Sequence, residues 1–199
     1  MSSYTNSSCA FALVLMGALG IAGSGTVLAD DQAAASAPAG QSKLERGKYL
    51  VTTSGCNDCH TPFKLGPNGP APDMDRMLSG HPQDLEMPDP PELPEGPWAV
   101  VAAATNTAWA GPWGVSFTAN LTPDKETGLG KWTLRNFIET IRTGRHLGRG
   151  RVILPPMPIP MYKHMTDEDL EAVFVYLQSI KPVENKVPEP RPPAGWDEM

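Results

Sequence analysis

The stretch GCNDCH, residues 55–60, constrains this chain more than any other feature of its sequence. Cys56 and Cys59 are three positions apart, and His60 follows the second cysteine directly. The third cysteine, Cys9, lies at the start of an apolar segment near the N-terminus. The motif therefore calls for a chemistry that uses two neighbouring thiols and an adjacent imidazole.

Three chemistries use neighbouring thiols but explain this motif incompletely. A structural zinc site takes four nitrogen or sulfur ligands, usually from two pairs, and the remaining histidines are scattered singly along the chain at His81, His146 and His164. A thioredoxin-like redox pair belongs to a βαβ unit, but no alternating strand and helix pattern surrounds the motif. A structural disulfide gives His60 no role.

Covalent haem attachment explains all three residues. C-x-x-C-H is the signature of c-type haem proteins. Cys56 and Cys59 would form two thioether bonds to the porphyrin, and His60 would bind the iron. Because the sequence contains one such motif, we expect one haem c.

The second iron ligand is expected to be a methionine, which accompanies histidine in electron-carrying cytochromes. Met157 lies in LPPMPIP, residues 154–160, between four prolines. Proline fixes φ and has no N–H to donate, so we predict a stiff, extended segment that presents the Met157 sulfur in a set orientation. Met161 is the alternative ligand. The other methionines of the exported chain are interpreted as packing or surface residues, namely Met74, Met77, Met87, Met165 and Met199.

The N-terminal residues predict export. The apolar run CAFALVLMGALGIAG and the small residues VLA before Asp30 are typical of a signal peptide over residues 1–29. An uncleaved anchor is the alternative, although the run is short for a span of about 20 residues. We expect a flexible linker over residues 30–41 and a periplasmic protein, soluble or peripheral to the cytoplasmic membrane.

Composition limits the remaining fold and function classes. The 199 residues include 19 glycines and 22 prolines, which favours a small core with long loops. A net charge of -6 gives no support for nucleic-acid binding, because that requires basic surface against phosphate. The length suits one domain, which we place at residues 42–182. It would contain a proline-rich loop insertion at about 64–116 and be followed by a proline-rich tail at 183–199.

Three amphipathic helices are predicted from apolar spacing. They run from Leu44 to Thr53, from Thr133 to Gly144, and from Thr166 to just before Pro182. Thr166 is a suitable N-cap and Gly144 a suitable helix end. Gly47 would allow close approach of the first and last helices, with Phe174 or Leu177 as the expected neighbour.

A group of cations follows the second predicted helix in a chain that is acidic overall. It has two interpretations: a solvated helix end, or a patch that attracts an acidic partner or holds haem propionates. The group consists of Arg142, Arg145, Arg149, Arg151 and Lys163.

With these motifs in place, residues 42–182 resemble class I c-type cytochromes. More narrowly, they are similar to the bacterial monohaem cytochromes c that accompany membrane-bound dehydrogenases. The resemblance is carried by GCNDCH, ANLTPDKETGLGKWT, IRTG, PPMPIP and MTDEDLEAVFVYLQSI. It implies an all-α cytochrome c fold around one covalent haem, attached through Cys56 and Cys59. His60 would be the proximal and Met157 the distal iron ligand.

The resemblance also implies a function. The chain would be a single-electron carrier and not an enzyme. Its redox partners would include a membrane-bound dehydrogenase or a terminal oxidase of a respiratory chain, and it could be a subunit of such a complex. The alternative is a haem-based sensor of small molecules, or a peroxidase-like enzyme, in which the distal ligand is labile.

Overall fold

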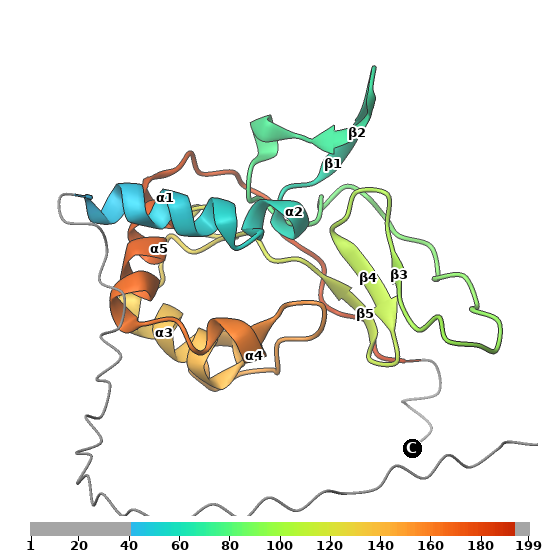
Figure 1. Cartoon of the computed structure of the whole chain (residues 1–199). Coiled ribbons are helices and arrows are strands. Elements are labelled where there is room, and N and C mark those ends of the chain that lie inside the picture. The colour runs from blue at the N-terminus through green and yellow to red at the C-terminus, as the bar shows by residue number, and fades with distance from the viewer. Residues whose placement is uncertain (1–40, 194–199) are drawn as a thin grey trace, which may run out of the picture. The chain divides into compact units, whose positions relative to one another are not determined.

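The computed structural model describes residues 41–193 of the protein (Figure 1). The predicted signal peptide, nearly all of the predicted linker and the last six residues lie outside this range. Within it the structure contains five α-helices and two short 3-10 helices. The α-helices are α1 (Lys43–Thr53), α2 (Cys56–His60), α3 (Leu134–Thr143), α4 (Ile159–Tyr162) and α5 (Asp167–Ser179), and the 3-10 helices are η1 (Met74–Arg76) and η2 (His146–Gly148).

The three predicted amphipathic helices are confirmed as α1, α3 and α5. The Ser42 side chain caps α1 and the Thr133 side chain caps α3, each within a capping box. Helix α3 ends at Gly144, whose φ of 66° is readily adopted only without a side chain. Thr166 caps α5 through the backbone N–H of Asp169. Local capping and apolar spacing therefore set these boundaries.

Helices α1 and α5 pack against each other (Figure 1), and Gly47 lies at their contact. A side chain at Gly47 would collide with the backbone of Ala172 and with Cβ of Tyr176. The predicted close approach is confirmed, but its α5 neighbours are not Phe174 or Leu177. The two ends of the predicted domain are thereby joined.

The hydrophobic core lies among these helices. Its buried side chains come from α1, α3, α5 and the connecting segments, and burying them supplies the main stabilising free energy. The largest are Leu50, Val51, Leu78, Leu129, Phe137, Ile141, Leu170, Val173 and Leu177. Cys56 of the motif and Met157 both pack against this cluster while remaining partly exposed.

The prediction of an all-α fold is wrong. Residues 63–117 contain two small antiparallel sheets: a hairpin of β1 (Phe63–Gly66) and β2 (Gly69–Pro72), and a sheet in the order β3 (Val101–Ala102), β4 (Ala108–Gly111) and β5 (Gly114–Phe117). Each strand has two to four residues, too few for a period-two pattern to be recognised. Two-residue turns join β1 to β2 and β4 to β5, and each is followed by a glycine at positive φ, Gly69 or Gly114.

The segment between η1 and β3 keeps the predicted loop character. Residues 85–100 contain no helix or strand, and most of their side chains are exposed. Trp98 is 75% exposed. The hairpin projects away from the helices, whereas the β3–β5 sheet lies beyond α2 as seen from α1 (Figure 1).

The chain after α5 returns across the molecule to the sheet (Figure 1). The carbonyl of Val183 accepts a hydrogen bond from Asn120 Nδ2 at 2.8 Å. Farther along, the backbone of Arg191 pairs with that of Val115 in β5. We call residues 183–191 the return segment. Among residues 41–193, no helix is both long enough and apolar enough to cross a membrane.

Candidate functional site

The C-x-x-C-H motif forms a short helix directly after α1. Gly55, with φ of 71°, turns the chain from α1 into α2. Cys56 and Cys59 are one helical turn apart, so their side chains leave the same side of α2. Both are free thiols. This arrangement presents two thiols side by side, as attachment to one planar group requires.

The thiols do not resemble a redox-active pair. Burial raises the pKa of the Cys56 thiol to about 11. Burial, followed by the charge of Asp58, also raises the pKa of Cys59. Redox-active and metal-binding cysteines instead have lowered pKa values that favour the thiolate. Within residues 41–193, no three His, Cys, Asp or Glu side chains lie together as a metal site would require. The structure thus gives no support to the thioredoxin or zinc alternatives.

His60 is buried and held in one orientation. Its side chain is 8% exposed, and Nδ1 lies 2.7 Å from the backbone carbonyl oxygen of Ala119. A carbonyl oxygen can only accept, so Nδ1 carries the hydrogen and donates it. Burial lowers the pKa of His60, and the Ala119 carbonyl only partly opposes this. The ring is therefore neutral, with the lone pair on Nε2.

This tautomer is the one that a metal-binding histidine needs. Histidine ligands usually donate their second ring N–H to a carbonyl or carboxylate, which fixes the ring and increases its basicity. Within the described residues, Nε2 of His60 makes no hydrogen bond that would compete for its lone pair. Together with the two thiols on the preceding turn, His60 fits the proximal side of a haem c.

The segment around Met157 is held on its N-terminal side by two hydrogen bonds. The Ser116 hydroxyl of β5 donates to the Pro155 carbonyl at 2.6 Å, and the Ile153 N–H donates to the Gly144 carbonyl at 2.8 Å. The extended segment predicted for residues 154–160 is shorter than expected, because α4 begins at Ile159. Proline is tolerated in the first turn of a helix, which explains how Pro160 fits there.

The structure distinguishes the two candidate methionines of this segment. Met157 is partly buried against the core cluster, against which Cys56 also packs. Met161 is 70% exposed. Met77 and Met165 also pack against the core, as a packing role predicts. Of the two candidates, burial therefore favours Met157 over Met161, and the role of Met157 as iron ligand remains a proposal.

Tyr162 joins this segment to the motif, a role that the sequence did not suggest. Its hydroxyl donates to the Ser54 carbonyl at 2.5 Å, at the corner between α1 and α2. Burial, followed by the nearby Cys56, Cys59 and Asp58, raises the pKa of Tyr162 to about 12. The phenol is thereby bonded to the corner from which the motif helix starts. No local pattern could have revealed this contact, because 108 positions separate Tyr162 from Ser54.

The cations after α3 are divided between structural and exposed positions. Arg142 donates to the Lys163 carbonyl and to Asp167, and Arg151 lies 3.6 Å from Glu189. The side chains of Arg145, Arg149 and Lys163 are exposed. These three are thus available to an approaching partner near the Met157 segment.

Comparison with known proteins supports the resemblance read from the motifs, although no protein-family model matches the chain. The chain is 35% identical to a subunit of the nicotinate dehydrogenase of Pseudomonas putida over 146 residues, which are 73% of this chain. It is 27% identical to the cytochrome c subunit of the quinone-type alcohol dehydrogenase of Gluconobacter oxydans, over 76% of this chain. It is also 27% identical to the fructose dehydrogenase cytochrome subunit of Gluconobacter japonicus, over 79% of this chain.

The matches cover a minor part of each relative. They span 9% of the nicotinate dehydrogenase protein and 25% of each of the two cytochrome subunits. The names of the two cytochrome subunits imply haem c as the cofactor, consistent with the fit of the thiols and His60. The recognition made from the motifs is confirmed: the chain is similar to the cytochrome c subunits of dehydrogenases, which is consistent with a c-type cytochrome.

Proposed function

We propose that this protein is a periplasmic monohaem cytochrome c that carries single electrons from a dehydrogenase to an acceptor. The observation that carries the proposal is the state of His60: buried, neutral, and oriented by Ala119 so that Nε2 is free. A neutral imidazole with one ring nitrogen free is the form of histidine that binds a metal. The relatives support the same interpretation, since several are named as cytochrome subunits of dehydrogenases.

Each site residue has a distinct role in this proposal. Cys56 and Cys59 would hold the porphyrin through thioether bonds, and His60 would bind its iron. When bound, haem c would supply a centre that takes up and releases one electron. Met157 would be the second iron ligand, which would exclude water and small molecules and raise the reduction potential. These residues would thus permit electron transfer while blocking chemistry at the iron.

The proposed electron donor is a dehydrogenase, by analogy with the relatives. Arg145, Arg149 and Lys163 are exposed near the Met157 segment, in a chain whose net charge is -6. Such a local excess of positive charge attracts an acidic protein surface and speeds encounter at low ionic strength. We therefore propose that the partner presents acidic residues to this side of the molecule.

The test begins with the full-length protein expressed with export and c-type haem assembly. Its mass should increase by one haem, and the haem should stay bound after acid and organic extraction. Carbon monoxide is then added to the dithionite-reduced protein. An unchanged visible spectrum is expected, because Met157 closes the sixth position.

The outcomes separate the candidate functions. Protein without covalent haem contradicts the proposal entirely. Covalent haem with a prompt spectral shift on carbon monoxide addition means an open or labile distal position, and would favour the small-molecule sensor or the peroxidase-like enzyme. The mass of the exported chain also reports whether it is cleaved after Ala29.

A further inference from the structure

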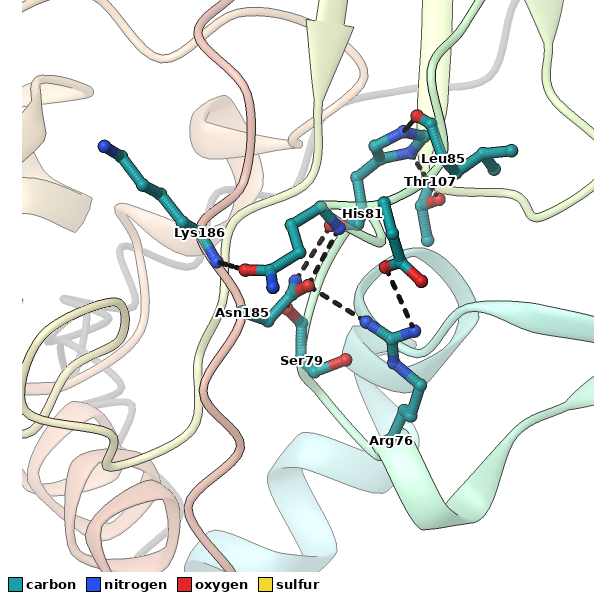
Figure 2. A network of polar contacts seen from close by, with 9 residues as sticks. Arg76, Ser79, His81, Leu85, Thr107, Asn185 and Lys186 are labelled. Carbon is teal, nitrogen blue, oxygen red and sulfur yellow. Dashed lines mark hydrogen bonds and ion pairs between the residues drawn. The ribbon is translucent and has the colours of Figure 1, made fainter.

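Asn185 lies at the centre of a buried polar network between the return segment and the loop that contains η1. Its side chain is fully buried, at 0% exposure. Nδ2 donates to the carbonyls of Ser79 at 2.7 Å and His81 at 2.8 Å. Oδ1 accepts from Arg76 Nη2 and from the Gln83 backbone N–H, both at 2.9 Å (Figure 2). The amide therefore uses both donors and both acceptor positions.

The other side of the return segment is bound to the chain around Asn120. Asn120 Nδ2 donates to the Val183 carbonyl at 2.8 Å. The backbone N–H of Asn185 donates to the Thr127 hydroxyl at 2.9 Å. The return segment thus holds residues 76–83 and residues 120–127 together.

These two stretches continue into the backbone that fixes His60. The Gly80 N–H donates to the His60 carbonyl at 2.8 Å. Ala119, whose carbonyl accepts from His60 Nδ1, lies between two cross-links: the His81 N–H donates to the Thr118 carbonyl at 3.0 Å, and the Leu121 N–H donates to the Leu78 carbonyl at 2.9 Å. The position of the Ala119 carbonyl therefore depends on the loop that Asn185 holds.

The backbone at Gly80 packs tightly against the backbone of residues 118–119. Gly80 has φ of 77°, and a side chain there would collide with the backbone of Thr118 and Ala119. A small displacement of residues 79–81 would therefore be transmitted directly to Ala119. Buried, fully satisfied networks are rigid, because each lost bond leaves a costly unpaired group.

We propose that Asn185 is a positioning residue for the proximal ligand, acting through residues 79–81 and the Ala119 carbonyl on His60. The proposal rests on the proposed function, because it requires His60 to bind iron. Hydrogen bonds to the second nitrogen of a metal-bound histidine set the orientation of the ring and its basicity. Asn185, 125 positions after His60 in the sequence, would thereby influence the reduction potential.

The test compares Asn185→Asp with Lys186→Ala. Asn185→Asp is nearly isosteric and keeps an acceptor for Arg76, but it removes the two hydrogen bonds donated to Ser79 and His81. Lys186→Ala is the matched control on the same segment. Its backbone N–H joins the network through Gln83, whereas its side chain points away from it (Figure 2).

Two readouts on the holoprotein respond to the ligand and not merely to folding: the midpoint potential, and the paramagnetically shifted haem-methyl proton signals of the oxidised form. Loosening the Ala119 carbonyl weakens the hydrogen bond from Nδ1 and makes the imidazole a poorer electron donor. We expect Asn185→Asp to raise the midpoint potential by up to about 59 mV, a tenfold change in the one-electron equilibrium. It should also change the haem-methyl pattern, and Lys186→Ala should change neither.

An unchanged potential and methyl pattern in Asn185→Asp, with only a lower melting temperature, would overturn the inference and leave a structural role. If Asn185→Asp yields no folded holoprotein, Asn185→Ser decides. A serine hydroxyl can replace at most one of the two hydrogen bonds that Asn185 donates to Ser79 and His81, and a change of the same sign is required. A wild-type protein without covalent haem contradicts the proposed function. If the wild type carries covalent haem but the variants keep its midpoint potential and haem-methyl pattern, only this inference is contradicted.

Discussion

The two predicted iron ligands lie in regions that differ in how they are held. His60 is 8% exposed, and its ring is fixed by a hydrogen bond to Ala119. Met157 is only partly buried and follows exposed prolines, and the hydrogen bonds of its segment come from the backbone and from Ser116. A directed bond orients a side chain, while packing alone leaves it freer to move. We therefore expect substitutions on the proximal side to shift the midpoint potential, and substitutions on the distal side to let small molecules reach the iron.

The largest effect is expected from Met157→Ala. Loss of the thioether should lower the midpoint potential by on the order of tenths of a volt, within the span of about 0.8 V that axial ligands cover. It should also allow carbon monoxide to bind the reduced protein. Redox titration and visible spectroscopy measure both effects.

Met161→Ala is the control for that change, because Met161 is 70% exposed and lies on the same segment. It should leave the potential and the carbon monoxide response unchanged. If Met157→Ala leaves the potential unchanged and Met161→Ala lowers it, the distal ligand is Met161. The distal ligand would then be an exposed side chain.

The same two regions show how far the sequence alone leads. The proximal residues could be proposed from the sequence because attachment chemistry requires Cys56, Cys59 and His60 to be adjacent. Met157 could be proposed because prolines mark its segment. The partners that orient them could not be predicted, since the Ala119 carbonyl has no residue-type signature, and Asn185 is more than 100 positions from the loop that it holds.

The fold also has a part that the sequence predicts and a part that it does not. Helices α1, α3 and α5 were predictable because each carries an apolar stripe together with a capping residue. The strands between Phe63 and Phe117 were not, because pairing between segments of two to four residues depends on turns and on tertiary contacts. Local signals determine the helical part of the fold, and long-range contacts determine the rest.

A smaller effect is expected from Ser116→Ala, which tests the distal side without removing the ligand. The variant loses the hydrogen bond to the Pro155 carbonyl, at a cost of about 1 kcal/mol in the free energy of unfolding. Because the Met157 segment is then less firmly held, carbon monoxide should bind the reduced protein more readily than in the wild type. Denaturant unfolding and carbon monoxide titration measure the two changes.

Ser54→Ala is the matched control, since within residues 41–193 the Ser54 hydroxyl makes no hydrogen bond and only its backbone N–H and carbonyl are used. It should behave as the wild type in both measurements. Equal carbon monoxide affinity in Ser116→Ala and wild type would mean that packing against the core is sufficient to hold Met157 in place. The distal side would then be as well fixed as the proximal side.

The smallest effect concerns the proximal network and pH. His81 is fully buried; Nε2 lies 3.1 Å from the Leu85 carbonyl, and Nδ1 lies 2.9 Å from the Thr107 hydroxyl. Because the carbonyl only accepts, Nε2 carries the hydrogen and Nδ1 accepts from Thr107, which requires a neutral ring. Burial, assisted by the charge of Arg76, lowers the pKa of His81, and the Leu85 carbonyl opposes this.

The free energy of unfolding should therefore fall as the pH is lowered. Above the ordinary histidine pKa of about 6.5 the ring is neutral in both states and contributes no pH dependence. Below it the unfolded chain binds a proton that the folded protein does not, so stability decreases until the lowered pKa is reached. His81→Gln removes this titration and should flatten the dependence between about pH 7.5 and 5 in guanidinium unfolding of the holoprotein. An equally steep dependence in the variant would assign the titration to another group, and the network around His81 would then tolerate a charge.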